Sequence, residues 1–206
     1  MPSLDHEHEL RSLGYLTIAG VDEVGRGPLA GPVCAAAAIL PHDFHHEVLD
    51  DSKKLSEKQR ETIYEELTTN TSVVWCCKFI EVEEIDRINI LQASRRAMRK
   101  AVAGLKIKVD AALIDGLPVP KFPVHQRSLV KGDSLSFSIA AASVIAKVTR
   151  DRLMHKLAKK YPNYGFEKHK GYGTPLHLEA LRTHGPCIIH RRSFSPVAQQ
   201  TFDFSE

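Results

Sequence analysis

Two apolar runs joined by a short loop rich in glycine and proline limit most strongly what this chain can fold into. Residues 17–21 read as a first strand and residues 33–40 (VCAAAAIL) as a second. A return this short favours an antiparallel pair of strands. Residues 72–80 are rich in strand-forming residues, and residues 109–114 (VDAALI) have the mostly apolar composition of a strand covered on both faces. These runs predict a mixed sheet.

Helical patterns lie between and after these strands. Ser56 and Gln59 have capping-box spacing ahead of a helix whose Ile63 and Leu67 share one face. Further helices are expected over about residues 90–103, ended by Gly104, after Asp133, and between Thr174-Pro175 and Gly185-Pro186. The small residues early in the long helix after residue 133 would pack, whereas its basic half, which includes Lys147, Arg150 and Lys160, would face water or phosphate. Together these elements predict an α/β domain.

Length and composition are those of an ordinary globular protein. The 206 residues allow a substantial core without disulfide or metal staples, and 43% of them are hydrophobic and 26% charged. The formal net charge of +3 permits nucleic-acid binding without indicating it. The cysteines lack C-x-x-C spacing, so we expect buried free thiols in a reducing compartment rather than a metal site. They are Cys34, Cys76, Cys77 and Cys187.

The N-terminal segment, residues 1–13, is polar and is expected to be either a short helix or a frayed arm. It lacks the apolar core of a signal peptide, and no segment approaches the length needed to span a membrane. We therefore expect a cytoplasmic protein that binds no membrane. Nothing in the sequence requires more than a monomer, and a monomer is our expectation.

Two adjacent carboxylates, Asp22 and Glu23, end the first strand immediately before the glycine-rich loop. Gly25 and Gly27 lack a Cβ, so the backbone around Arg26 can approach a ligand closely. Arg26 adds a planar charged fork that suits phosphate. This combination indicates a metal held next to a nucleic-acid or nucleotide phosphate. Acid and glycine at a strand end are also the ordinary composition of a turn, so the motif alone leaves both interpretations open.

Two further carboxylates follow later strand and helix signals. Asp115 ends the strand at 109–114, where ligands of open α/β sheets gather, and Asp133 precedes the long helix, where it would equally serve as the N-cap. If the strands carrying Asp22 and Asp115 are neighbours, four carboxylates converge. Such an all-oxygen site favours Mg²⁺ or Mn²⁺, and two ions about 4 Å apart would place a water for attack on a phosphodiester.

One geometric condition applies to Asp22 and Glu23. Neighbouring residues in a regular strand point to opposite faces of the sheet. The two carboxylates can therefore share a site only if the strand ends or bulges between them, or if one residue binds the metal through its backbone carbonyl.

Several sequence blocks, in this order, resemble the type 2 ribonucleases H, and most closely bacterial ribonuclease HII, over residues 19–197. The blocks are AGVDEVGRGPLAGPV, LDDSKKLS, LIDG, VKGDS, AASVIAKVTRDR, YGFEKHKGYGT and HRRSF. The resemblance implies an RNase H-like α/β fold, with a mixed five-stranded sheet flanked by helices and a C-terminal helical extension. It also implies an N-terminal arm over residues 1–16 and a catalytic domain over residues 17–206.

The activity implied by the resemblance is that of a metal-dependent endoribonuclease using Mn²⁺ or Mg²⁺ in a two-metal site. Such an enzyme cuts the RNA strand of RNA/DNA hybrids and incises duplex DNA on the 5′ side of an embedded ribonucleotide. The products carry 3′-hydroxyl and 5′-phosphate ends. The implied partners are therefore RNA/DNA hybrids and ribonucleotide-containing duplex DNA.

The resemblance also implies roles for individual residues. The four metal-binding, catalytic carboxylates match Asp22, Glu23, Asp115 and Asp133. The loop that reads the 2′-hydroxyl at the RNA-to-DNA junction matches Gly25, Arg26 and Gly27. Tyr172 matches the tyrosine that stacks on the sugar beyond the junction, a sensible role because only the 2′-hydroxyl distinguishes ribose from deoxyribose.

Other positions carry weaker expectations. Lys53 would contact phosphate, although an exposed lysine before a helix is otherwise merely solvated, and Tyr172 would otherwise be a packed surface aromatic. Leu117 stands where the family commonly has asparagine, so any hydrogen bond made from that position is in doubt. We expect the histidines of the tail to be structural or to face phosphate rather than to bind metal. They are His169, His177 and His190.

Two alternative functions compete with this prediction. The sister enzyme, ribonuclease HIII, typically carries an extra N-terminal substrate-binding domain and lacks this G-R-G sequence, whereas only a short arm precedes Ile18 here. A non-catalytic nucleic-acid-binding module with the same fold is the second alternative. Four intact carboxylates argue against it, because unneutralised acids repel the phosphate backbone.

Overall fold

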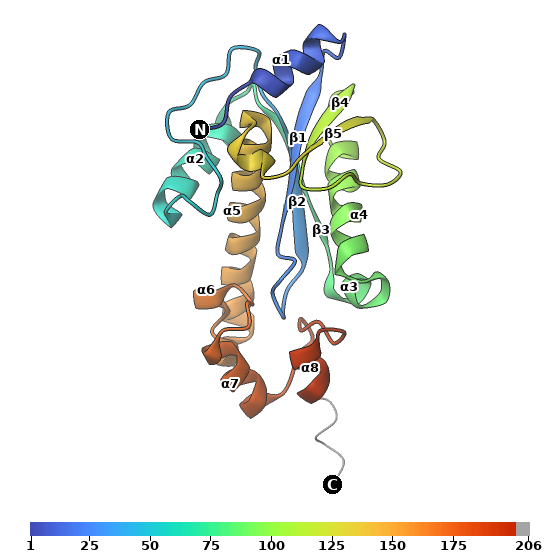
Figure 1. Ribbon diagram of the computed structural model, residues 1–206. Helices are drawn as coiled ribbons and strands as arrows, with labels where there is room; N and C mark the ends of the chain where they lie inside the picture. Colours follow the sequence, from blue (N-terminus) through green and yellow to red (C-terminus); the bar gives the residue numbers. More distant parts are fainter. Residues whose placement is uncertain (201–206) are drawn as a thin grey trace.

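A five-stranded sheet forms the centre of the structure, and helices cover both of its faces (Figure 1). The computed structural model describes residues 1–200. The strands are β1 (Ile18–Val24), β2 (Val33–Ile39), β3 (Val74–Ile80), β4 (Ala111–Asp115) and β5 (His125–Leu129). The α-helices are α1 (Asp5–Ser12), α2 (Glu57–Thr69), α3 (Val82–Ile88), α4 (Ile90–Ala103), α5 (Phe137–Lys160), α6 (Phe166–His169), α7 (Pro175–His184) and α8 (Ser195–Gln200). Two 3₁₀ turns complete the order, η1 (Gly132–Ser134) and η2 (Pro162–Tyr164).

The sheet is mixed, with the strand order β3-β2-β1-β4-β5. The short return between β1 and β2 gives an antiparallel pair, as predicted, and β2 pairs with β3 in the same way. The other two pairings, β1 with β4 and β4 with β5, are parallel. The segment pattern did not predict β5, because this edge strand has the polar sequence HQRSL and most of it is only half-buried. The predicted mixed five-stranded architecture is confirmed.

Two helical layers enclose the sheet (Figure 1). Helices α2 and α5 lie on one face, and α3 and α4 lie on the other. Strand β2 is buried along its whole length, with Ala36 and Ala38 facing the α5 layer and Ala35 and Ala37 facing the α4 layer. Alanine on both faces lets both helical layers approach the sheet closely, which explains the apolar, small-residue sequence of this strand.

Most predicted helix signals are confirmed. Ser56 and Gln59 form the complete capping box of α2, and Gly104 is the C-cap of α4. The prediction that the basic half of the long helix faces water or phosphate is wrong for Arg150, which is fully buried. Its guanidinium donates to backbone carbonyls rather than to solvent. The cysteines are free thiols, but only Cys34 is fully buried.

The N-terminal segment forms helix α1 and packs against the sheet and the start of α5. Leu10 is fully buried, and the buried carboxylate of Glu7 accepts hydrogen bonds from Ser136 Oγ at 2.7 Å and Ser138 N at 3.0 Å. These two hydrogen bonds connect the first turn of α5 to Glu7 in the N-terminal helix. Residues 201–206 of the expected catalytic domain lie outside the described residues. Within residues 1–200, no helix has both the length and the apolar character needed to cross a membrane.

The closest approach between the sheet and a helix occurs at Gly20 in the middle of β1. A Cβ at this position would lie 2.0 Å from the carbonyl carbon of Ser138 and 2.3 Å from the backbone nitrogen of Ile139. The first turn of α5 therefore rests directly on the backbone of β1. No side chain larger than hydrogen fits between them, and neither backbone can yield easily because both belong to regular elements.

Replacing Gly20 with alanine should lower the free energy of unfolding by about 3 kcal/mol or more, because the added methyl group meets backbone rather than a movable side chain. Urea unfolding followed by circular dichroism would measure this change. Gly27→Ala is the matched control, since a Cβ at position 27 would meet only the Tyr172 ring, at 3.5 Å. Equal stability of both variants would contradict the close backbone contact.

Candidate active site

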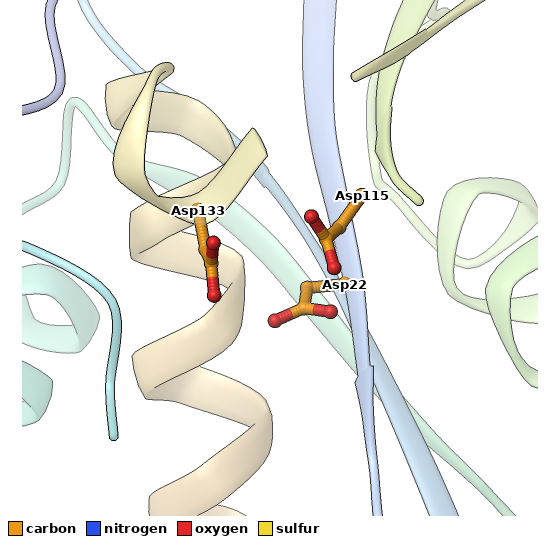
Figure 2. Close-up of side chains that lie close together, drawn as sticks. All are labelled: Asp22, Asp115 and Asp133. Carbon is orange, nitrogen blue, oxygen red and sulfur yellow. The ribbon is translucent and has the colours of Figure 1, made fainter. Parts of the chain in front are cut away.

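Three aspartates from distant parts of the sequence meet at one edge of the sheet (Figure 2). Asp22, Asp115 and Asp133 each offer a carboxylate oxygen, and these oxygens lie within 4.8 Å of one another. We call this group the aspartate cluster. Asp22 comes from β1, Asp115 from the last position of β4, and Asp133 from the turn η1 before α5. The structure thus brings together three of the four acids that the sequence predicted to converge.

Strand pairing and one hydrogen bond bring the aspartate cluster together. Strands β1 and β4 are parallel with Val21 opposite Ile114, so the next residues, Asp22 and Asp115, lie side by side. Asp115 Oδ1 then accepts a hydrogen bond from Gly132 N at 2.7 Å, which ties the end of β4 to η1. The alternative that Asp133 is the N-cap of the long helix is wrong. The cap is Ser136, whose side chain accepts from Ile139 N.

Burial and mutual repulsion make the charged form of this cluster costly. Asp22 is only 5% exposed, and its pKa is raised well above the usual value by desolvation and then by the charges of Glu23 and Asp115. A hydrogen bond from Ser143 offsets part of this shift. The pKa of Asp133 is raised to about 6, again mainly by desolvation and then by Asp115 and Asp51. A bound cation would relieve both effects.

Glu23 does not join the aspartate cluster, because β1 neither ends nor bulges between Asp22 and Glu23. The pairing with β2 continues through Val24 opposite Cys34, so consecutive side chains point to opposite faces. Glu23 faces the α4 layer, where it lines a pocket of about 200 Å³ together with Arg26 and Asp115. Asp115 therefore belongs to the aspartate cluster and also lines the pocket in front of Glu23.

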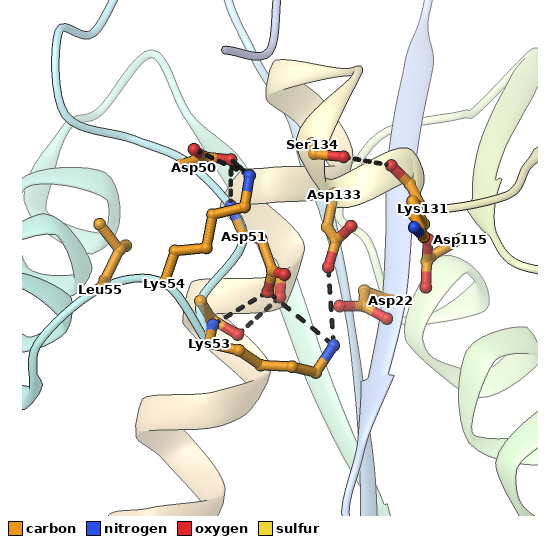
Figure 3. A network of polar contacts seen from close by, with 12 residues as sticks. Asp22, Asp50, Asp51, Lys53, Lys54, Leu55, Asp115, Lys131, Asp133 and Ser134 are labelled. Atoms are coloured by element: carbon orange, nitrogen blue, oxygen red, sulfur yellow. Dashed lines mark hydrogen bonds and ion pairs between the residues drawn. The ribbon is translucent and has the colours of Figure 1, made fainter.

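Lysines surround the aspartate cluster on the α5 side of the sheet (Figure 3). Lys53 Nζ lies 3.7 Å from Asp133 Oδ2 and 3.8 Å from Asp51 Oδ1, while its side chain stays 78% exposed. Partial burial alone would lower the pKa of Lys53, but the charges of Asp51 and Asp133 outweigh it and raise the pKa. A pocket of about 470 Å³ here is also lined by Lys54 and Lys131. Its cations suit an approaching phosphate chain.

The loop after β1 lies against the C-terminal segment that carries Tyr172. Leu29 N donates to Gly171 O at 2.8 Å, and the Cα of Gly27 faces the Tyr172 ring, which is 42% exposed. Gly25 has a φ of +91°, a conformation that favours glycine. Arg26 is half-exposed and donates to Glu23 Oε1 at 3.2 Å. The predicted loop and the predicted tyrosine are thus neighbours beside the acidic site.

The three histidines of the tail are buried and pack together, so they neither face phosphate nor join the acidic site. His177 Nε2 lies 3.0 Å from His190 Nε2, and the rings of His169 and His177 are stacked. Burial lowers the pKa of each, that of His190 to about 4. Neutral imidazoles in this position support the prediction of a structural role.

The family model described as Ribonuclease HII matches residues 19–197 of this chain. The chain belongs to the ribonuclease HII family. It is 53% identical over 197 residues to the ribonuclease HII of Desulfitobacterium hafniense (strain DSM 10664 / DCB-2), covering 96% of this chain and 75% of that protein. It is 54% identical over 194 residues to the ribonuclease HII of Chlamydia caviae (strain ATCC VR-813 / DSM 19441 / 03DC25 / GPIC), covering 94% and 91%.

A solved structure agrees with this family membership. The crystal structure of the ribonuclease H2 from Pyrococcus horikoshii OT3 is similar with a TM-score of 0.74 and 27% identity, over 90% of this chain and 97% of that chain. The RNase H-like fold implied by the sequence is therefore confirmed. Members of the ribonuclease HII family are metal-dependent hydrolases that cut the RNA strand of hybrids and incise DNA at embedded ribonucleotides. Family membership therefore confirms the predicted enzyme class and reaction.

Several polar residues around the ribonuclease HII site were not predicted. Ser143 hydrogen-bonds to Asp22 from α5, and its hydroxyl lies 2.9 Å from that of the buried Ser52. Asp51 lies between Lys53 and Asp133. The LDDSKKLS block contains two of these three residues and was the available signal. Ser143 lies in the AASVIAKVTRDR block, but a serine within a run of small helical residues is typical of ordinary packing and was not singled out.

Asp133→Asn should stabilise the metal-free enzyme at pH 7.5 by about 1–2 kcal/mol, because it removes a buried charge beside two other carboxylates. The folded-state pKa of Asp133 is raised from 3.8 to about 6. The contribution of protonated Asp133 to the free energy of unfolding is therefore fully present below pH 4 and is lost as the pH rises through 6. The gain from the substitution should accordingly vanish near pH 4.

Urea unfolding in chelator at pH 4 and pH 7.5 would measure this difference between variant and unmodified protein. Asp43→Asn, which makes the same chemical change in an exposed loop, is the control and should have no such pH-dependent effect. A loss of stability at pH 7.5 would show that Asp133 is held by favourable contacts that outweigh the repulsion.

Proposed function

We propose that Asp22, Glu23, Asp115 and Asp133 are the catalytic metal ligands of an endoribonuclease that incises on the 5′ side of an embedded ribonucleotide. The products would carry 3′-hydroxyl and 5′-phosphate ends. The observation that carries this proposal is the aspartate cluster, three converging carboxylates of which two are buried, beside a glycine loop and an exposed tyrosine.

The donor set fits hard divalent cations. The aspartate cluster offers only oxygen ligands, which suit Mn²⁺ or Mg²⁺ better than softer metals. Asp22, Asp115 and Asp133 would hold one ion, while Asp115 and Glu23, which border a common pocket, would hold the other. The bound ions would activate a water and stabilise the leaving oxygen of the phosphodiester. Lys53 would contact a phosphate of the scissile strand from the exposed side of the cluster.

Recognition of the ribonucleotide is assigned to the neighbouring loop. Gly25, Arg26 and Gly27 would contact the 2′-hydroxyl at the junction, and Tyr172 would stack on the next sugar. Two features support this assignment: Gly27 presents no side chain toward Tyr172, and the tyrosine ring is partly exposed. A sugar approaching Gly27 would thus meet backbone on one side and an aromatic face on the other.

We also propose a monomeric, cytoplasmic enzyme, with residues 17–206 as the catalytic domain and residues 1–16 as its arm. Ribonucleotide-containing duplex DNA and RNA/DNA hybrids would be its substrates. Glu7 of the arm supports the start of α5, next to the turn that carries Asp133, so the arm would contribute to the active site indirectly.

Cleavage of a DNA duplex containing one ribonucleotide, with Mn²⁺, with Mg²⁺ and with chelator, tests this function. We expect metal-dependent incision on the 5′ side of the ribonucleotide and a loss of about a thousandfold or more in Asp115→Asn, because the metals supply several kcal/mol. The asparagine can still accept the hydrogen bond from Gly132 N, so the variant should fold. Asp110→Asn, at the other end of the same strand, is the control.

The outcomes separate the competing functions. Cleavage of long hybrids without incision at a single ribonucleotide would favour the specificity of ribonuclease HIII. Full activity of Asp115→Asn would refute the metal assignment, and hybrid binding without cleavage under any metal condition would favour a non-catalytic binding module.

Tyr172→Ala should reduce kcat/KM about tenfold on the single-ribonucleotide duplex and less on a long hybrid, because the loss of one contact worth about 1.4 kcal/mol is a factor of ten. A long hybrid offers many equivalent registers, so one stacking contact matters less there. Parallel cleavage assays with Tyr172→Phe as the control, which keeps the ring, would measure the difference. Equal losses on both substrates would rule out a stacking role at the junction.

A further inference from the structure

Two fully buried arginines lie beneath the glycine loop that follows β1. Arg150 comes from the middle of α5, and Arg191 comes from the HRRSF segment near the C-terminal end. Both are 0% exposed, and neither guanidinium forms an ion pair with a carboxylate anywhere in residues 1–200. A buried charge without a counter-charge is costly, so other polar groups must satisfy these arginines.

The guanidinium of Arg191 donates all of its hydrogen bonds within the described chain to backbone carbonyls of the loop. Its Nε and one terminal nitrogen donate to Gly31 O at 3.0 and 2.8 Å. The terminal nitrogens also donate to Gly25 O at 2.6 Å and to Arg26 O at 2.9 Å. The ring of Phe194 lies 5.1 Å from the guanidinium carbon. One side chain therefore joins both ends of the loop.

Arg150 holds the adjoining backbone from the other side. It donates to Pro32 O at 3.0 Å, to Ala30 O at 3.2 Å and to Lys170 O at 3.0 Å. Lys170 precedes the Gly171-Tyr172 pair, so the same guanidinium links the loop to the segment that carries the tyrosine. A Cβ on Gly25 would lie 2.2 Å from Arg150 Nε, which shows how closely the loop is seated.

Stability alone does not explain two such residues. Burial and the nearby charge of Arg150 lower the pKa of Arg191 to about 9, which shows that the charged form is disfavoured at this position. Buried ionic groups can often be replaced by well-packed apolar residues without loss of stability. The forked guanidinium donors therefore have a role that apolar side chains cannot fill. That role is to hold the loop carbonyls in fixed positions.

The direction of those carbonyls decides where the loop presents its donors. In a planar trans peptide the C=O and the following N–H point in opposite directions. Because Gly25 O and Arg26 O point at Arg191, the N–H groups of Arg26 and Gly27 point away from it. Neither N–H group makes a hydrogen bond within the described chain. The loop thus keeps two backbone donors free beside Tyr172.

We propose that Arg150 and Arg191 form an arginine frame that positions the loop donors for the 2′-hydroxyl of a ribonucleotide, and that this frame determines incision at a single embedded ribonucleotide. This inference rests on the loop role given under the proposed function. A duplex with one ribonucleotide offers one 2′-hydroxyl, so the donors must be placed accurately. A hybrid offers one at every step and tolerates misplacement. The two arginines are positioning residues, because their own side chains remain buried.

Lysine variants test the arginine frame. Arg191→Lys and Arg150→Lys keep the charge but replace the fork by a single ammonium, which cannot hold carbonyls at both ends of the loop. We expect kcat/KM to fall about tenfold or more on the single-ribonucleotide duplex and no more than about threefold on the hybrid. Hydrogen exchange of a peptide covering residues 24–32 should become faster in both variants, and Mn²⁺ binding should be retained.

The control is Ile63→Ala on α2, a buried position far from the loop that lowers stability without touching it. It should reduce both activities equally and leave loop exchange unchanged. A substrate ratio in both lysine variants equal to that of the unmodified enzyme would overturn the inference, as would unchanged loop exchange. If one variant fails to fold, the other still decides.

The failure of the proposed function would look different. In that case the unmodified enzyme itself would not incise at a single ribonucleotide, and the specificity role of the frame would be overturned with it. Loop exchange would still show whether the two arginines hold the loop.

Discussion

The active site depends first on the backbone contact between β1 and α5 at Gly20. Only Val21 separates this glycine from Asp22, and the first turn of α5 lies directly on Gly20. The turn that carries Asp133 immediately precedes that helix and is tied to Asp115 by the Gly132 hydrogen bond. A larger residue at position 20 would lift the helix and separate the aspartates. A glycine with no functional group thus sets the geometry of the aspartate cluster.

Two groups of like charges, the aspartate cluster and the two buried arginines, lie near the loop after β1. The structure accommodates each group in a different way. Asp22 and Asp133 are buried beside Asp115, so the pKa values of Asp22 and Asp133 are raised and their charged forms are disfavoured. The two arginines are buried without carboxylates but are satisfied by carbonyls. A cation would offset the repulsion within the first group, whereas hydrogen bonds to carbonyls already satisfy the second group. This difference separates a ligand site from a structural support.

The C-terminal segment packs against the loop after β1 and is not a separate appendage. The backbone of Gly171 accepts from Leu29, Ala30 pairs with His190, and Arg191 reaches the loop carbonyls. Figure 1 shows the C-terminal helices beneath the β1–β2 turn. The loop, the tyrosine and the acids therefore come from four separate stretches of sequence: β1 with the loop after it, the end of β4, η1 and the segment that carries Tyr172. The position of the loop relative to Tyr172 consequently depends on packing between segments that are distant in the sequence.

The sequence by itself determined four strands, the N-terminal capping box of α2, the extent of α4 and three acids that meet at the sheet edge, because these follow from local periodicity and short motifs. Only the tertiary structure decided the rest. Strand β5 is polar and exists through pairing with β4. Glu23 lies on the opposite face from Asp22 because pairing with β2 continues through Val24. Asp133 is not a cap, and Arg150 is buried. Each of these outcomes depends on neighbours distant in sequence, which local patterns cannot encode.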